Sequence, residues 1–183
     1  MENYIPEKRE TPELMRSMPT AWGDIPTILK DIIERFEVGN KKCIEFGVEF
    51  GYSTSALANY FEEVIGIDTF EGDVHAGIRT NHFQMTSENL SSFPNIKLVE
   101  STYQDYCKED SKERFDFAHV DIVHTYEDTF SCGDWCVARS KVTIFHDTES
   151  YPEVKRAVTD LAKKHNAKCY NYLGSYGLGI IVK

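Results

Sequence analysis

The sequence lacks the features that would place a protein in a membrane or on a polyanion. No apolar run approaches membrane-spanning length, and the start, Met1 to Arg9, lacks the apolar core of a signal peptide. The 30 acidic side chains outnumber the 20 basic ones, so the formal net charge is -10. Nucleic acid and anionic membranes are therefore not expected partners. We expect a soluble, cytoplasmic protein.

The sequence also lacks a cysteine pattern typical of disulfides or zinc sites. Its five cysteines are an odd number and are widely spread: Cys43, Cys107, Cys132, Cys136 and Cys169. Cys132 and Cys136 share a helix face at i, i+4 spacing, but no other cysteine or histidine completes a metal pattern with them. Reduced structural thiols are therefore the better interpretation.

A third absence is the G-x-G-x-x-G motif of dinucleotide-binding enzymes, whose middle position is occupied here by Glu49. The stretch from Lys41 to Asp68 nevertheless predicts a strand, a glycine turn, a helix and a second strand. The first apolar run ends at Gly47, Gly51 follows four residues later, and the second run ends in Asp68. This order is typical of a nucleotide-binding βαβ unit.

The charges of this unit favour a cationic cofactor. Glycine lets the backbone approach a ligand closely, a helix N-terminus offers free N–H groups, and Asp68 can accept hydrogen bonds from ribose hydroxyls. Glu45, at the end of the first strand, and Glu49, in the turn, would repel a phosphate but suit a positive charge. S-adenosylmethionine carries a sulfonium, an ammonium and no phosphate, so it fits this pattern.

Four blocks of the sequence resemble a known family. Glu45-Phe46-Gly47 through Gly51-Tyr52-Ser53-Thr54 is similar to the E-x-G-x-x-x-G-x-S-T signature of class I S-adenosylmethionine-dependent methyltransferases, especially small-molecule O-methyltransferases. Three later blocks resemble a branch often found beside sugar-modifying enzymes: Ile67 to Gly77, His119 to Glu127 and Phe145 to Thr148. Each block alone is a weak signal, but four in the right order are a strong one.

The resemblance implies where the cofactor binds. Its methionine end is expected near Glu45, Gly47 and Ser53, its ribose at Asp68, and its adenine beside the turn that follows the third strand. The full set of cofactor-binding residues that the resemblance implies is Glu45, Phe46, Gly47, Gly51, Ser53, Asp68, Thr69, Thr102 and Asp121.

The order of apolar segments predicts an α/β fold. Strands are expected at 43–46, 64–68, 96–100, 115–120 and 142–145, with helices between them and a closing antiparallel hairpin of 168–173 and 178–182. This alternation implies a Rossmann-like, doubly wound, mostly parallel sheet of seven strands. By resemblance the strand order is 3-2-1-4-5-7-6. We expect a polar, proline-containing N-terminal arm at 1–21 and a single domain at 22–183.

Two neighbouring strand ends carry the candidate catalytic residues. The fourth strand delivers Asp121 and His124 to the carboxyl edge, and the fifth delivers His146 and Asp147. Methyl transfer to a hydroxyl needs an aligned acceptor and removal of its proton, by a histidine base or with the help of a divalent metal. We expect the two carboxylates to form one catalytic cluster with His124 or His146.

The predicted metal ligands are Asp121, His146 and Asp147. By resemblance, metal-dependent O-methyltransferases place oxygen ligands at these strand ends. A histidine in place of one oxygen weakens the case for magnesium and leaves manganese, iron or a metal-free histidine base. An opposing interpretation is that these acids only cap helices. In addition, Ile122 stands where the branch usually has glycine, which restricts the turn before His124.

Three functions compete at this point. The first is a methyltransferase that uses S-adenosylmethionine and acts on a hydroxyl of a small molecule or sugar. The second is an NAD-linked oxidoreductase, which Glu45 and the missing glycine disfavour, and the third is a non-catalytic cofactor-binding protein. The loop 69–83, with His75 and His82, is a candidate for acceptor contact. The sequence leaves open which acceptor is used and whether the chain forms a homo-oligomer.

Overall fold

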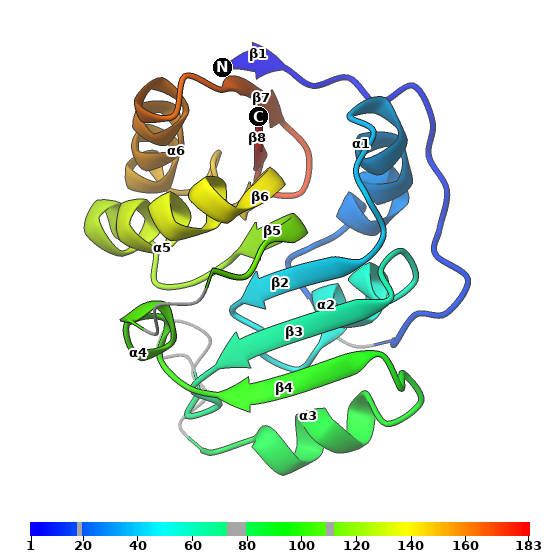
Figure 1. The fold of residues 1–183 in the computed structure, drawn as a ribbon. Coiled ribbons are helices and arrows are strands. Elements are labelled where there is room, and N and C mark those ends of the chain that lie inside the picture. The colour runs from blue at the N-terminus through cyan, green and yellow to red at the C-terminus, as the bar shows by residue number, and fades with distance from the viewer. Residues whose placement is uncertain (18–19, 73–79, 109–111) are drawn as a thin grey trace.

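The computed structural model describes residues 1–17, 20–72, 80–108 and 112–183, and these residues form an eight-stranded sheet with helices on both faces (Figure 1). The strand order is β1-β7-β8-β6-β5-β2-β3-β4. Strand β8 is antiparallel to both of its neighbours, and the other pairs are parallel. The strands are β1 (Glu2–Asn3), β2 (Lys42–Phe46), β3 (Glu63–Asp68), β4 (Ile96–Glu100), β5 (Phe115–Val120), β6 (Ser140–His146), β7 (Lys168–Tyr172) and β8 (Leu178–Val182).

The expected fold class is confirmed, and β2 to β8 follow the expected order of seven strands. The structure adds an eighth strand, because β1 pairs in parallel with β7, with Glu2 opposite Tyr170 and Asn3 opposite Asn171. A polar strand of two residues shows no alternation of apolar and polar side chains, so hydrophobic periodicity could not predict it.

Helices cover both faces of the sheet, and α5 and α6 pack side by side on one of them (Figure 1). The helical segments are η1 (Ile25–Ile28), α1 (Leu29–Arg35), α2 (Tyr52–Leu57), α3 (Phe83–Asn89), α4 (Tyr103–Lys108), α5 (Tyr126–Arg139) and α6 (Pro152–Lys164). In the described ranges, no helix combines the length and the apolar character needed to cross a membrane.

Two hydrophobic cores lie on the two faces of the sheet. Cys43 and Phe117 point into the core formed with α1 and α2, whereas Ile44 and Ala118 point into the core formed with α5 and α6. Successive strand residues face opposite sides of a sheet, so each central strand contributes to both cores. This double burial explains the continuous apolar runs of the sequence. Because β2, β3, β5 and β6 pair in parallel, their carboxyl ends lie along one edge of the sheet.

The N-terminal segment is packed more firmly than the expected polar arm. Tyr4 is buried in the core beside α1, and its hydroxyl donates a hydrogen bond to the Asp31 carboxylate. The backbone N–H groups of Glu7 and Lys8 donate to the other oxygen of Asp31, over 3.2 and 3.1 Å. The buried Tyr4 ring and the buried Asp31 carboxylate therefore hold in place an N-terminal segment that is otherwise mostly polar. The division into an arm at 1–21 and a domain at 22–183 stays a prediction.

Candidate functional site

The turn after β2 approaches the end of β5 very closely. Gly47 has a φ of 91°, and a Cβ at this position would lie 1.7 Å from the Asp121 carbonyl oxygen. The Gly47 N–H donates to the Ile67 carbonyl over 2.9 Å, and the Asp121 N–H donates to the Phe46 carbonyl over 2.8 Å. Only glycine satisfies both the left-handed backbone and this contact. The turn and the backbone of Asp121 therefore form one interlocked unit.

Gly51 ends the turn and begins α2. Its φ is 89°, and a Cβ here would lie 2.7 Å from the Leu90 side chain. Ser53 follows in the first turn of the helix and is buried. Gly51 and Ser53 thus lie where the glycine turn meets α2, which is where the sequence predicts that the cofactor binds.

Asp68, at the end of β3, holds the glycine turn closed. Its Oδ2 accepts hydrogen bonds from the N–H groups of Val48 and Glu49, each over 2.8 Å, and its Oδ1 accepts one from the Phe70 N–H over 2.8 Å. A carboxylate offers about four lone-pair sites. The donors among the described residues therefore leave one acceptor site on Oδ1 for a ribose hydroxyl, so the expected contact fits. The sequence did not reveal that Asp68 also fixes the turn.

Glu45 is fully buried beneath the turn. The Thr54 hydroxyl donates to its Oε2, and His119 Nδ1 lies 2.8 Å from its Oε1. The Trp22 ring packs against His119, with 4.8 Å between the ring centroids. Glu45 thus ties β2 to α2 and β5. Its contact with the cofactor stays a prediction.

The remaining predicted cofactor residues serve local structure as well. Phe46 is buried in the core with α5 and α6. The Thr69 hydroxyl accepts a hydrogen bond from the Glu71 N–H over 3.4 Å. Thr102 caps α4, because its hydroxyl accepts from the Asp105 N–H over 3.1 Å and donates to the Asp105 carboxylate over 2.9 Å. The cofactor contacts of all three stay predictions.

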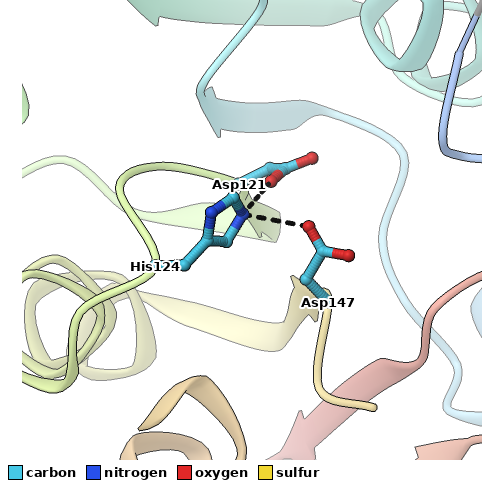
Figure 2. A group of neighbouring side chains, drawn as sticks. All are labelled: Asp121, His124 and Asp147. Atoms are coloured by element: carbon cyan, nitrogen blue, oxygen red, sulfur yellow. Dashed lines mark ion pairs between the residues drawn. The ribbon is translucent and has the colours of Figure 1, made fainter. Parts of the chain in front are cut away.

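The ends of β5 and β6 bring Asp121, His124 and Asp147 together, with the His124 ring directed at both carboxylates (Figure 2). His124 Nε2 lies 2.9 Å from Asp147 Oδ2 and 3.6 Å from Asp121 Oδ1. One ligand atom from each residue lies within 4.8 Å of the other two. Neither buried ring nitrogen of His124 makes an aligned hydrogen bond to a described residue. Two carboxylate oxygens and an imidazole nitrogen that faces both of them are a donor set that fits a divalent metal, which would take the place of the imidazole proton.

His146, the expected third metal ligand, lies behind Asp121. Its Nδ1 is 3.1 Å from Asp121 Oδ2, and its Nε2 is 3.0 Å from the Ser175 carbonyl oxygen. Because both neighbours are hydrogen-bond acceptors, both ring nitrogens are used as donors and neither lone pair is free for a metal. The geometry thus groups the two acids with His124, which the predicted catalytic cluster included, whereas the predicted metal set named His146; the metal ligands stay a prediction. The reason is placement: His146 ends β6 and is buried, whereas His124 lies on the loop after β5.

Asp121 and the two imidazoles of the site have shifted proton affinities. Burial would raise the pKa of Asp121, but His124 and His146 outweigh it and hold that pKa well below its usual range. Burial would lower the pKa of His124, but the carboxylates of Asp121 and Asp147 raise it to about 9. Burial would lower the pKa of His146, but the Asp121 carboxylate favours the charged ring, and the pKa is raised. Mutual attraction of opposite charges thus holds the group together.

Two features that the sequence did not reveal hold these residues in place. The His124 ring is stacked on Tyr151, with 4.0 Å between centroids and 5° between planes. The carbonyl that accepts from His146 belongs to the turn between β7 and β8, in which Ser175 and Tyr176 have φ values of 49° and 64°. The Gly177 N–H closes this turn on the Gly174 carbonyl over 2.9 Å. Two left-handed central residues define a type I′ hairpin turn.

The N-terminal segment reaches the same turn. The Ser175 hydroxyl donates to the Asp24 carboxylate, and the Asp24 N–H donates back to the Ser175 hydroxyl over 3.0 Å. Arg9 and the Tyr172 hydroxyl also donate to this carboxylate. A chain of hydrogen bonds therefore runs from Asp24 through Ser175 and His146 to Asp121.

The two histidines predicted on the loop after β3 have different outcomes. His75 lies outside the described residues. His82 is buried at the start of α3, with Nδ1 3.3 Å from the Thr80 carbonyl oxygen and its ring 5.0 Å from that of Phe50. Phe50 belongs to the glycine turn, so His82 packs beside the expected cofactor site. Its contact with an acceptor stays a prediction.

Solved structures with this fold include several methyltransferases. The O-methyltransferase NovP matches with a TM-score of 0.70 and 13% identity, over 87% of this chain and 78% of that one. An O-methyltransferase from Bacillus cereus in complex with SAH matches with a TM-score of 0.61 and 15% identity, over 94% and 84%. SAM-bound CalS10, an amino pentose methyltransferase from Micromonospora echinaspora, matches with a TM-score of 0.64 and 11% identity, over 89% and 92%.

Sequence comparisons give one curated relative and one family model. An uncharacterized protein of Sinorhizobium fredii, y4gI, is 26% identical over 120 residues, which are 60% of this chain and 13% of that much longer protein. A family model described as a methyltransferase domain matches residues 44–148. This range spans more than half of the chain and includes the glycine turn, Asp68 and the cluster of Asp121, His124 and Asp147. The expected family is thereby confirmed, and the chain belongs to the methyltransferase domain family.

Proposed function

We propose that this chain is an S-adenosylmethionine-dependent O-methyltransferase that acts on a hydroxyl of a small molecule, with a sugar as the favoured acceptor. The observation that carries the proposal is the cluster of Asp121, His124 and Asp147 at the carboxyl edge, interlocked through Gly47 with the glycine turn. Ligands of open α/β sheets bind at this edge. Structural relatives with bound SAM or SAH, and an amino pentose methyltransferase among them, support the proposal.

The cofactor would lie across the glycine turn. Asp68 keeps one acceptor position for a ribose hydroxyl while it holds the turn through Val48, Glu49 and Phe70. The acidic side chains of this edge favour a sulfonium over a phosphate. Asp121 joins the two halves of the site, because its backbone abuts the turn and its side chain belongs to the cluster.

Asp121, His124 and Asp147 would hold a divalent metal and the acceptor hydroxyl beside the methyl group. The chemistry supplied by a bound divalent ion is a lowered pKa of that hydroxyl. His146 keeps Asp121 oriented through its Oδ2, which leaves Oδ1 directed at His124. Tyr151 fixes the His124 ring by stacking. Alignment of acceptor and methyl is the main contribution expected of the protein itself.

Turnover measurements on Asp121→Asn and Asp147→Asn test this proposal. Release of S-adenosylhomocysteine would be followed with free sugars, glycosides and catechols as acceptors. We expect each variant to lose at least about a hundredfold in kcat, while calorimetry shows an S-adenosylhomocysteine affinity within about threefold of wild type. Chelation should reproduce the loss in wild type.

Asp134→Asn is the matched control, because Asp134 pairs with Lys164 and His165 on the α5–α6 side, outside the cluster. It should leave turnover unchanged. If turnover survives chelation and its rate rises as the pH approaches about 9, the base would be His124 and no metal would be needed. No binding of S-adenosylhomocysteine would overturn the proposed function altogether.

A further inference from the structure

We infer that the Asp121–His124–Asp147 cluster selects a first-row transition dication, such as Mn²⁺, Fe²⁺, Co²⁺ or Zn²⁺, over Mg²⁺. The inference rests on the proposed function and specifies the metal of that same site. Its starting point is the donor set, which contains an imidazole nitrogen where an all-oxygen site would have a carboxylate or amide. Mg²⁺ prefers oxygen ligands in near-ideal octahedral geometry, whereas imidazole suits transition metals.

The spacing of the donor atoms suits coordination of one ion by all three residues. Neighbouring ligands of an octahedral ion with bonds of about 2.1 Å lie about 3 Å apart. His124 Nε2 is 2.9 Å from Asp147 Oδ2 and 3.6 Å from Asp121 Oδ1. The three donor atoms lie within 4.8 Å of one another, and the carboxylates would move closer together when they bind an ion. His124 would therefore be a direct ligand.

The His124 ring is also fixed in the orientation that such a ligand needs. Parallel stacking on Tyr151, at 4.0 Å and 5°, restrains rotation of the ring. Its buried Nε2 makes no aligned hydrogen bond to a described residue. A ring held in this way cannot readily swing aside to let water take its place around Mg²⁺. Ligands preorganised by their neighbours bind metals more tightly and more selectively.

The two oxygens of Asp121 have separate tasks. Oδ2 faces His146 Nδ1 at 3.1 Å, and Oδ1 faces His124. The carboxylate is thereby directed to bind an ion through one oxygen. His146 contributes by position and not as a ligand, since its Nε2 is used on the Ser175 carbonyl. The site therefore offers one nitrogen and two oxygens from the protein, with remaining positions for cofactor, acceptor or water.

Equilibrium metal titration of the full chain tests the inference without any acceptor. After removal of metals, Mn²⁺ and Mg²⁺ affinities would be measured by calorimetry, and Co²⁺ binding by its visible absorption, which changes with the ligands and the geometry around the ion. Most nitrogen and oxygen sites favour the later transition metals. The decisive quantity is therefore the change in the ratio of Mg²⁺ to Mn²⁺ dissociation constants between wild type and His124→Asp.

We expect His124→Asp to lower this ratio at least about tenfold and to alter the Co²⁺ spectrum. His124→Asn should weaken Co²⁺ and Mn²⁺ as well, and it serves as a second variant if the added acid disturbs the fold. His165→Asn is the matched control, because His165 Nε2 also pairs with an acid, Asp134 Oδ1 at 2.7 Å, away from the site. It should change neither the ratio nor the spectrum.

The outcomes separate this inference from the proposed function. A ratio that is the same in wild type and His124→Asp, with binding retained, would overturn transition-metal selection and leave the methyltransferase proposal standing. Metal binding that survives Asp121→Asn and Asp147→Asn would remove the ion from the cluster and overturn the inference. Loss of S-adenosylhomocysteine binding in wild type would contradict the proposed function whatever the titrations give.

Discussion

Strands β3 and β5 both end in an aspartate at the same edge of the sheet, yet the two carboxylates have different surroundings. Asp68 accepts three backbone N–H groups, from Val48, Glu49 and Phe70. In the part of the chain that the structure describes, no backbone N–H donates to the Asp121 side chain, which faces two imidazoles, His124 and His146. The first carboxylate is used mainly to shape a turn, and the second is placed among groups that can bind ions and move protons.

The difference shows what a strand-end acid can mean. An acid whose lone pairs are taken by backbone N–H groups contributes structure, and it can serve a ligand only through the acceptor position that remains. An acid surrounded by side chains keeps its chemistry adjustable, because each neighbour shifts its proton affinity. The same sequence pattern, an apolar run that ends in Asp, precedes both. The surroundings of the side chain separate the two roles.

Gly47→Ala should have the largest effect, because it disrupts the close contact between the turn after β2 and the end of β5. The new Cβ would lie 1.7 Å from the Asp121 carbonyl oxygen, at a φ of 91°. The backbone must move, so we expect a loss of more than about 4 kcal/mol in the free energy of unfolding. Chemical denaturation measures this loss.

Gly179→Ala is the control for this substitution. Its Cβ would meet only the Thr148 and Val158 side chains, at 3.0 Å. We expect a stability within about 1 kcal/mol of wild type. Equal effects of the two glycine substitutions would contradict the interlocking of turn and strand end.

Asp68→Asn and Asp121→Asn should each weaken the response to a different ligand. An amide cannot accept at both former oxygens, so Asp68→Asn should lower the free energy of unfolding by about 1.5–3 kcal/mol. It should also reduce the rise in Tm caused by S-adenosylhomocysteine, while the rise caused by Mn²⁺ persists. Asp121→Asn should lose the Mn²⁺ effect and keep the other. If both variants lost the same ligand response, the two acids would not have separate roles.

Asp24 gives the smallest predicted effect. Burial would raise the pKa of Asp24, but hydrogen bonds from Ser175, Tyr172 and Arg9 outweigh it and lower that pKa. A lowered folded-state pKa adds stability above the unfolded pKa of about 3.9, and this stability is lost as the pH falls through the folded pKa. The side chain is 44% exposed, so we expect less than about 1 kcal/mol.

Thermal unfolding of wild type and Asp24→Asn at several pH values measures this contribution. The Tm difference should be present at pH 7 and should shrink progressively as the pH falls below about 4. A difference that does not depend on pH would assign the effect of Asp24 to shape and not to charge.

The fold was largely predictable from the sequence, for a physical reason. Apolar residues at strand spacing predict a strand, so the largely buried β5 (Phe115–Val120) and the half-exposed edge strand β4 (Ile96–Glu100) both begin and end at the expected residues. The strand order came from the family resemblance, because periodicity carries no information on which strands are neighbours. β1 and the burial of Tyr4 escaped prediction, because a short polar segment held by Asp31 has no periodic signal.

The candidate site was predictable in its position and not in its detail. Adjacent parallel strands end at one edge, so the meeting of Asp121 and Asp147 followed from topology. Whether His124 or His146 joins them depends on side-chain direction, which the sequence does not specify. The β-branched Ile122 was expected to disturb the placement of His124, yet His124 reaches the cluster. Stacking on Tyr151, from a different element, could not be foreseen.

The hairpin turn of Ser175 and Tyr176 has a consequence for engineering. Both residues occupy a left-handed backbone that glycine and asparagine adopt at lower cost. The turn also presents the carbonyl on which His146 depends and the hydroxyl that Asp24 holds. A replacement loop must therefore place a backbone carbonyl oxygen at the same position, facing His146 Nε2. Without it, His146 would lose this acceptor and would no longer hold the Asp121 carboxylate in its orientation.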